Sequence, residues 1–224
     1  QRQMCIRDSA KVVDKDVKLP EERKTSAESL EADTLEVLSD LNHASQKGLQ
    51  TIFDCSVGRS TVNHPLGGRY QLTPTEASVQ KLPVQHGVTH TASVMAQGFN
   101  PYLAEWSPYH GAAYAVIEAT ARLVAAGANW SKARFSYQEY FERMDKQAER
   151  FGQPVAALLG SIEAQIQLGL PSIGGKDSMS GTFEELTVPP TLVAFGVTTA
   201  DSRKVLSPEF KTAGENIYYI PGQA

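Results

Sequence analysis

The chain has 224 residues, of which 41% are apolar and 21% charged, and its formal net charge is −4 at neutral pH. Its size suits a globular protein with a sizeable core, and its acidic and basic residues are interspersed, which excludes the clustered basic face of a nucleic-acid-binding protein. Its two cysteines exclude a disulfide framework, and no apolar run reaches the roughly 18 residues of a bilayer span, so we expect a cytoplasmic protein with no nucleic-acid or membrane partner.

The first half of the chain predicts one helix followed by short strands. Residues 1–28 mix charged residues with Pro20 and a few valines and indicate a strand tail and a linker. Residues 1–9 have neither periodicity nor a turn signal, so they are either part of this linker or sequence that is not native. Apolar residues at helical spacing predict a helix from Ser29 to Gly48. Short β-type runs follow over residues 51–73, and two further β regions are expected at 77–82 and 91–95.

Three helices are expected next, over residues 112–126, 135–150 and 154–168. A β-branched and aromatic run over 191–199 predicts a strand, and Ile217–Ile220 reads as a buried strand close to the end of the printed sequence, which indicates a fragment of a longer chain. The order of strands, helices and strands favours an α+β fold, a mostly antiparallel sheet with helices on one face.

The strongest local candidate for a binding site is the run Gly174, Gly175, Lys176, Asp177 and Ser178. Paired glycines let a backbone approach a ligand, successive N–H groups form an anion-binding nest, and a lysine and a hydroxyl supply donors for phosphate. The run is not a Walker A loop, because Leu170 stands where the first glycine is required. A glycine-rich turn joining a helix to a strand is the alternative interpretation.

Two glutamates are candidate metal ligands. Glu118 lies in an otherwise apolar helical segment, where a carboxylate must be solvated, paired or bound to a cation such as Mg²⁺. A glutamate at the edge of the apolar stripe that reaches water is the alternative. Glu76 begins a strand after a turn and is equally ambiguous by itself.

Several segments in order resemble one family, the phosphoribosylformylglycinamidine synthases in their long-chain form. The resemblance runs from about Leu35 to the C-terminus, and its most specific part is Gly175–Ser180 followed by Val188–Leu192. The other segments that carry it are Asp54–Gly58, Gly67–Thr75, Glu105–Gly111 and Phe135–Phe141.

This resemblance implies an enzyme, a carbon–nitrogen ligase of purine biosynthesis. The family converts formylglycinamide ribonucleotide to its amidine, with ATP to activate the amide oxygen and ammonia from glutamine. The implied cofactors are ATP or ADP and Mg²⁺, and the implied partners are the small-molecule substrate, the first synthetase half and the glutaminase domain. Because phosphoryl-transfer sites act only when complete, we expect the fragment to be inactive alone.

The resemblance also implies a division of the chain. Residues 1–28 would be the linker with the end of a preceding subdomain, and 29–66 a helix with a connecting strand. Residues 67–200 would be the second A subdomain, similar to that of aminoimidazole ribonucleotide synthetase, and 201–224 the truncated start of the following B subdomain. The sheets of two A subdomains pack together in the family, so we expect an exposed apolar sheet face here.

Site residues carry over by alignment. Glu76 and Glu118 fall on the acidic Mg²⁺ ligands of the family, and Thr75 with the Gly174–Ser178 run would contact nucleotide phosphate or substrate. Some members place an asparagine on the metal where this chain has Arg122. Three hypotheses follow: a catalytic part of a ligase, a structural subdomain that holds a nucleotide without a direct catalytic role, or a non-enzymatic α+β interaction domain.

Overall fold

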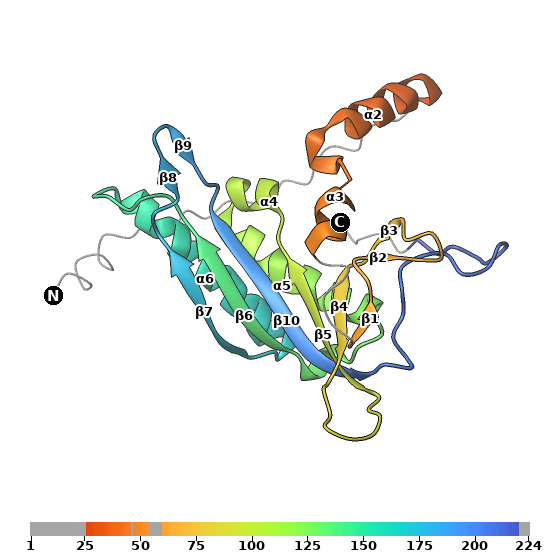
Figure 1. Cartoon of the computed structure of the whole chain (residues 1–224). Helices are drawn as coiled ribbons and strands as arrows, with labels where there is room; N and C mark the ends of the chain where they lie inside the picture. The colour runs from red at the N-terminus through yellow and green to blue at the C-terminus, as the bar shows by residue number, and fades with distance from the viewer. Residues whose placement is uncertain (1–25, 46, 54–59, 220–224) are drawn as a thin grey trace. The chain divides into compact units, whose positions relative to one another are not determined.

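A computed structural model describes residues 26–45, 47–53 and 60–219 (Figure 1). The described residues fall into two compact units. One holds residues 60–209, and the other holds the described residues of 26–53 and 210–219. No helix among these residues combines the length and the apolar character needed to cross a bilayer.

The larger unit is built on a six-stranded sheet with the order β1-β4-β5-β10-β6-β7. Every neighbouring pair is antiparallel except β6 and β7, which are parallel. The mostly antiparallel sheet expected from the sequence is therefore present. Its strands are β1 (Thr61–Asn63), β4 (Ala77–Lys81), β5 (Thr91–Gly98), β10 (Thr191–Asp201), β6 (Arg134–Tyr140) and β7 (Ser172–Ser178).

Two short hairpins stand apart from this sheet, each a pair of antiparallel strands. One pairs β2 (Leu66–Gly67) with β3 (Thr73–Pro74). The other pairs β8 (Thr182–Phe183) with β9 (Leu186–Thr187). The second hairpin connects β7, which is parallel to β6, with β10, which is antiparallel to β6. The chain therefore reverses its direction between β7 and β10.

The helices α5 (Pro108–Ala125) and α6 (Ala148–Leu168) lie behind the sheet in the view of Figure 1. Ser107 ends the short helix α4 (Pro101–Trp106) and its hydroxyl caps α5, with Pro108 at the first helical position. A single 3₁₀ turn, Trp130–Lys132, leads into β6. The strong helix expected at 112–126 is confirmed, and it begins earlier because the serine–proline pair starts it.

The core lies between the sheet and α5. Alternate residues of β5, including Val94, are buried, and they face α5 residues such as Val116 and Leu123. The two helices meet closely, because Gly160 of α6 lies against the backbone of Tyr109. A Cβ on Gly160 would stand 1.9 Å from the Tyr109 carbonyl oxygen. Packing of α6 on α5 therefore requires glycine at this position.

The other face of the sheet is partly apolar and open. No described helix of the larger unit covers this face in Figure 1. Met95 of β5 and Val197 of β10 are 44% and 40% exposed there. Phe195 is half-buried, and its partners on the neighbouring strands are the polar residues Gln97 and Ser136. The exposed apolar face expected from the sequence is thus a mixed surface with an apolar centre.

The smaller unit is helical. It contains α2 (Ala27–Ser39), a 3₁₀ turn (Leu41–His43) and α3 (Lys47–Phe53). Ser26 starts α2 through a capping box with Ser29. The single helix expected from Ser29 to Gly48 is therefore divided, because the chain turns to an extended conformation at Asp40.

Three further sequence expectations are wrong. Residues 51–53 belong to helix α3 and not to a β-type run. Residues 135–140 form strand β6 and not the first part of a helix, and α6 begins at Ala148. Residues 217–219 are not in a strand, and Ile220 lies outside the described residues. The segment Asp54–Gly58 also lies outside them.

Candidate functional site

Glu76 and Glu118, the two candidate metal ligands, converge on one arginine. Arg122 Nε lies 2.7 Å from a carboxylate oxygen of Glu76, and Arg122 Nη2 lies 2.8 Å from one of Glu118. Glu118 and Arg122 are one helical turn apart on α5, whereas Glu76 directly precedes β4. The structure thus brings the two glutamates together, with a guanidinium between them.

Two hydrogen bonds to the backbone also hold this cluster. The second carboxylate oxygen of Glu118 accepts a hydrogen bond of 2.8 Å from the backbone N–H of Phe99. Arg122 Nη1 donates to the carbonyl oxygen of Gln97 at 2.9 Å. The carboxylate charges are balanced by a cation of the chain itself, in a geometry with good hydrogen bonds.

This arrangement does not fit a magnesium ion. Mg²⁺ requires carboxylate oxygens that point into open, water-filled coordination positions, and the guanidinium of Arg122 occupies the space between Glu76 and Glu118. Across the described residues, no group of three or more His, Cys, Asp or Glu side chains could hold a metal ion.

Thr75 precedes Glu76, but its side chain is not paired as that of Glu76 is. Its backbone N–H donates to the carbonyl oxygen of Pro65. Its hydroxyl is buried and has no hydrogen-bond partner among the described residues. Burial of an unpaired hydroxyl is costly, so Thr75 remains a candidate for a ligand contact beside the Glu76 cluster.

The glycine-rich run is a strand and neither a nest nor a turn. Residues 172–178 form β7, whose backbone pairs in parallel with β6. Lys176 points away from α6, and its ammonium lies 5.6 Å from the ring centroid of Tyr140. Ser178 meets Ser180 through their hydroxyls at 3.3 Å.

Sheet order separates this strand from the Glu76 cluster. Three strands, β5, β10 and β6, lie between β4 and β7. With neighbouring strands 4.7–4.9 Å apart, β4 and β7 are roughly 19 Å from one another. The two groups of candidate residues therefore belong to different places on the unit.

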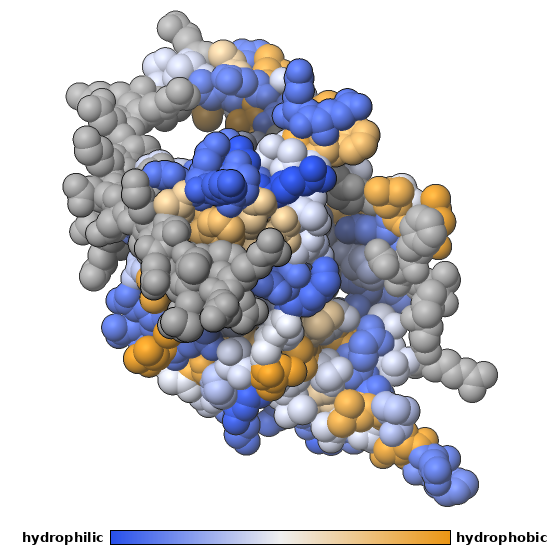
Figure 2. Space-filling view, turned by 90° about the vertical axis from the view of Figure 1, so that its left-hand side faces the viewer, coloured by the Kyte–Doolittle hydropathy of each residue, from blue (hydrophilic) through white to orange (hydrophobic). Residues whose placement is uncertain are grey.

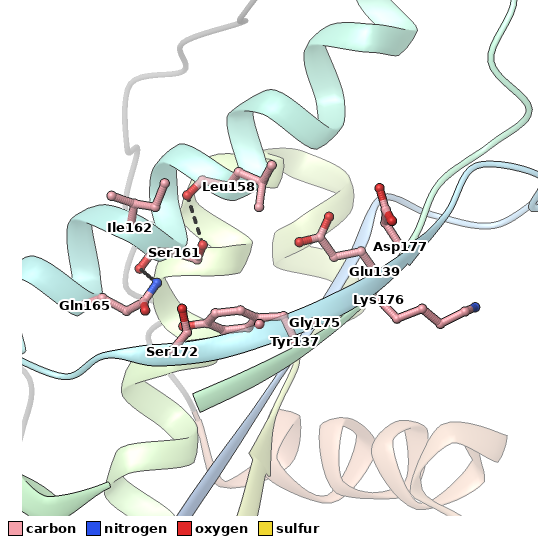
Figure 3. Close-up of a pocket in the computed structure, with 11 residues that line it drawn as sticks. Tyr137, Glu139, Leu158, Ser161, Ile162, Gln165, Ser172, Gly175, Lys176 and Asp177 are labelled. Atoms are coloured by element: carbon pink, nitrogen blue, oxygen red, sulfur yellow. Dashed lines mark hydrogen bonds between the residues drawn. The ribbon is translucent and has the colours of Figure 1, made fainter. Parts of the chain in front are cut away.

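A cavity of about 320 Å³ opens between α6 and β7 (Figure 3). Because α6 packs chiefly on α5 and makes few close contacts with β7 at the sheet edge, space remains between α6 and this strand. Its lining combines acidic, hydroxyl, amide and apolar groups from β6, β7 and α6. These residues are Tyr137, Glu139, Leu158, Ser161, Ile162, Gln165, Ser172, Gly174, Gly175, Lys176 and Asp177.

Two carboxylates lie side by side in this cavity. Glu139 and Asp177 are paired across the parallel strands β6 and β7, which places their side chains on the same face of the sheet. Figure 3 shows both carboxylates pointing toward α6. Burial, and then the negative charge of Asp177, raise the pKa of Glu139 to about 7.

Tyr137 has a buried hydroxyl in the same cavity. The side chain is only 6% exposed, and its hydroxyl has no hydrogen-bond partner among the described residues. Burial, and then the charge of Glu139, raise the pKa of this phenol well above its usual range. Gly175 lies close against Tyr137, since a Cβ there would stand 2.6 Å from the Tyr137 carbonyl oxygen.

Tyr137 and Glu139 were not among the candidates from the sequence, because residues 135–150 were assigned to a helix. The sequence does contain a pattern that indicates a strand here. Phe135, Tyr137, Glu139 and Phe141 alternate with more polar residues, and all four are buried. In a strand, alternate residues point to the same face, so this alternation places Glu139 at a core position. A glutamate in the core is usually paired or functional.

Comparison with known proteins gives the fold of the chain. No protein-family model matches it, and no curated protein matches it significantly. Among solved structures, PurLQS from Thermotoga maritima superposes with a TM-score of 0.63 at 19% identity, over 89% of this chain and 29% of that one. PurL of the same organism in complex with ATP gives 0.60 at 18% identity, over 89% and 28%.

A further Thermotoga maritima structure, phosphoribosylformylglycinamidine synthase II, gives a TM-score of 0.55 at 19% identity over 89% of this chain. The chain spans less than a third of the length of these structures. At such identities the likeness establishes a shared fold, and this chain is similar to a part of PurL in its mixed α/β architecture.

Proposed function

We propose that this chain is part of an ATP-dependent ligase that converts formylglycinamide ribonucleotide to the corresponding amidine, with glutamine as the source of ammonia. One observation carries the proposal: the fold likeness to PurL covers 89% of the chain. The ordered motifs of the sequence point in the same direction. Neighbouring structures hold ATP, ADP and formylglycinamide ribonucleotide, written FGAR.

In this proposal the remaining parts of the enzyme are supplied by other domains, the first synthetase half and the glutaminase. Residues 67–200 are the second A subdomain and 201–224 the start of the B subdomain, after a linker of 1–28 and a helix with its connecting strand over 29–66. The open sheet face centred on Val197 is the surface that packs against the other A subdomain.

The nucleotide site proposed for this half lies near Thr75, whose hydroxyl is unpaired among the described residues. Glu76 and Glu118 act there through Arg122, because the guanidinium stands between the carboxylates where a metal ion was expected. The Gly174–Ser178 strand, distant from Thr75, contacts phosphate or substrate through Lys176 on the open face.

A structural role for the nucleotide is the second candidate. The internal ion pairs of Arg122 favour it, because a site without a catalytic metal is better suited to holding a nucleotide than to transferring its phosphate. The two candidates differ in the intact enzyme. Loss of turnover with unchanged melting in Lys176→Ala or Asp177→Asn supports catalysis, whereas unchanged turnover supports the structural role.

Thermal melts of the 224-residue chain test the nucleotide proposal. A ligand that binds only the folded state adds about 2.7 kcal/mol at 100 times its dissociation constant, so ADP and ATP should raise the melting temperature visibly. Because Arg122 supplies the cation, the shift should be the same with Mg²⁺ and with EDTA. No shift with either nucleotide in either buffer would contradict the proposal.

A further inference from the structure

We propose that the cavity between α6 and β7 binds a small organic cation, with a planar amidine or amine head group between Glu139 and Asp177. The nucleotide site lies at the other end of the sheet. The cavity shares β7 with the proposed phosphate or substrate contact, but Asp177 points into the cavity whereas Lys176 points away from it (Figure 3). It rests on the placement of the carboxylates, on an unpaired buried hydroxyl and on the character of the cavity walls.

The carboxylates form a receptor for a hydrogen-bond donor with positive charge. Parallel pairing holds Glu139 beside Asp177 on the same face of the sheet, and Glu139 is only 6% exposed. Neither carboxylate has a hydrogen-bond or ion-pair partner among the described residues. Two adjacent acids repel one another when ionised, and a cation between them removes that repulsion.

Tyr137 gives a second, independent indication of a ligand. Its hydroxyl is buried without a partner in the described chain, and Figure 3 shows its ring lying beneath α6 along the cavity. Buried polar groups in folded proteins are nearly always hydrogen-bonded. A ligand that fills the cavity would supply the missing partner, as Gln165 and Ser172 stand beside the same space.

The walls select the class of ligand. Leu158 and Ile162 of α6 form an apolar side of the cavity, which suits a flat hydrocarbon body behind a polar head. The volume of about 320 Å³ equals that of roughly ten water molecules, so only a small molecule fits. Lys176 is the one basic residue in the described lining, and its side chain projects away from the cavity in Figure 3, which disfavours anions.

The apolar wall of the cavity is accessible. Figure 2 shows that apolar and polar residues are interspersed on the described surface of the side of the molecule that lies to the left in Figure 1. On α6, Leu158 and Ile162 are 42% and 46% exposed. They remain available to an apolar ligand surface.

Benzamidine is a suitable probe, because its planar cation matches two carboxylates and its ring matches the apolar wall. Benzamide and benzoate have the same shape but carry no charge and a negative charge, respectively. Isothermal titration of the full chain should detect benzamidine binding and at least about tenfold weaker binding of both analogues, since a charge-assisted hydrogen bond is lost.

Matched variants test whether benzamidine binds in this cavity. Glu139→Gln, Asp177→Asn and Tyr137→Phe should each weaken benzamidine binding, the first two by about tenfold or more. Glu185→Gln, which removes an exposed acid in the β8–β9 hairpin, should leave binding unchanged. Circular dichroism melts of each variant establish that the fold is retained, and Asp177 is exposed, so its variant should fold in any case.

The pH dependence gives a further readout. The groups that face Glu139 are Asp177 of β7 and Tyr137 of its own strand, and the cavity residues of α6 carry no charge. As the pH rises through about 7, Glu139 ionises and benzamidine should bind more tightly. Equal affinity for benzamidine and benzamide, binding that Glu139→Gln and Asp177→Asn leave unchanged, or no detectable binding of benzamidine would each overturn the proposal.

Discussion

Arg122 neutralises two carboxylates that reach it from different elements. Its side chain is 29% exposed, and Glu76 and Glu118 are 50% and 36% exposed. Replacement by asparagine leaves the two acids facing one another without a cation. We expect Arg122→Asn to lower the free energy of unfolding by about 1–2 kcal/mol in EDTA, measured by urea denaturation.

Magnesium should distinguish that variant from the wild type. Without the guanidinium, the carboxylates of Glu76 and Glu118 can hold Mg²⁺, which then replaces the lost charge. Millimolar Mg²⁺ should raise the melting temperature of Arg122→Asn and leave the wild type unchanged. Arg203→Ala removes an arginine that is 65% exposed and serves as the control. A Mg²⁺ response in the wild type would show that Arg122 does not exclude the metal.

Glu139 should make stability depend on pH in an unusual direction. Its pKa in the folded chain is about 7, above the ordinary value of 4.5. Between these values the unfolded chain ionises while the folded chain holds the proton, so stability falls as the pH rises. From pH 5 to pH 8 the wild type should lose about 2–3 kcal/mol of unfolding free energy relative to Glu139→Gln.

The comparison requires a variant that removes a charge elsewhere. Glu185→Gln removes an exposed glutamate and should follow the wild type between pH 5 and pH 8. Chemical denaturation at several pH values measures all three proteins. Parallel curves for Glu139→Gln and the wild type would mean that Glu139 is already ionised at pH 5.

The contact between α5 and α6 depends on one glycine. A Cβ at position 160 would meet the carbonyl oxygen of Tyr109 at 1.9 Å, so alanine must push the helices apart. Although alanine favours helices, we expect Gly160→Ala to destabilise the chain by about 2–4 kcal/mol. Gln167→Ala, at an exposed position of the same helix, should change the melting temperature little, and equal melting of the two variants would contradict this close packing.

Sequence patterns predicted the elements with long and regular periods. The helix around Val116 and the strand at 191–199 are present with modest changes at their ends. Strand β6 was taken for a helix because Glu139 interrupts its apolar alternation. Strand β7 was hidden by Gly174 and Gly175, since glycine has low strand propensity and pairing with β6 is a tertiary effect.

The sequence also predicted only part of the candidate sites. Resemblance to a family pointed to Glu76 and Glu118, and the structure brings them together. The ion pairs of Arg122 depend on side-chain geometry, which spacing along α5 suggests but does not determine. The cavity at Tyr137 depends on how far α6 stands from β7, and no local pattern encodes that distance.

The open sheet face should make the larger unit associate with itself. Met95 and Val197 are 44% and 40% exposed at its centre, and contiguous apolar surface favours association. Sedimentation velocity should detect larger species as the concentration rises. The double change Met95→Gln with Val197→Thr should reduce them, while Val124→Thr on α5, 48% exposed, should not. A wild type that stays monomeric at every concentration would contradict this expectation.

The position of β10 has a consequence for synthesis on the ribosome. This strand lies between β5 and β6 in the sheet, yet it is the last of the six to be translated. Until residues 191–201 leave the exit tunnel, β5 and β6 have no common neighbour and each keeps an unpaired edge. A nascent chain therefore exposes two unpaired strand edges, on β5 and β6, until β10 is available. We expect chaperones to bind these edges in the period before Thr191 emerges.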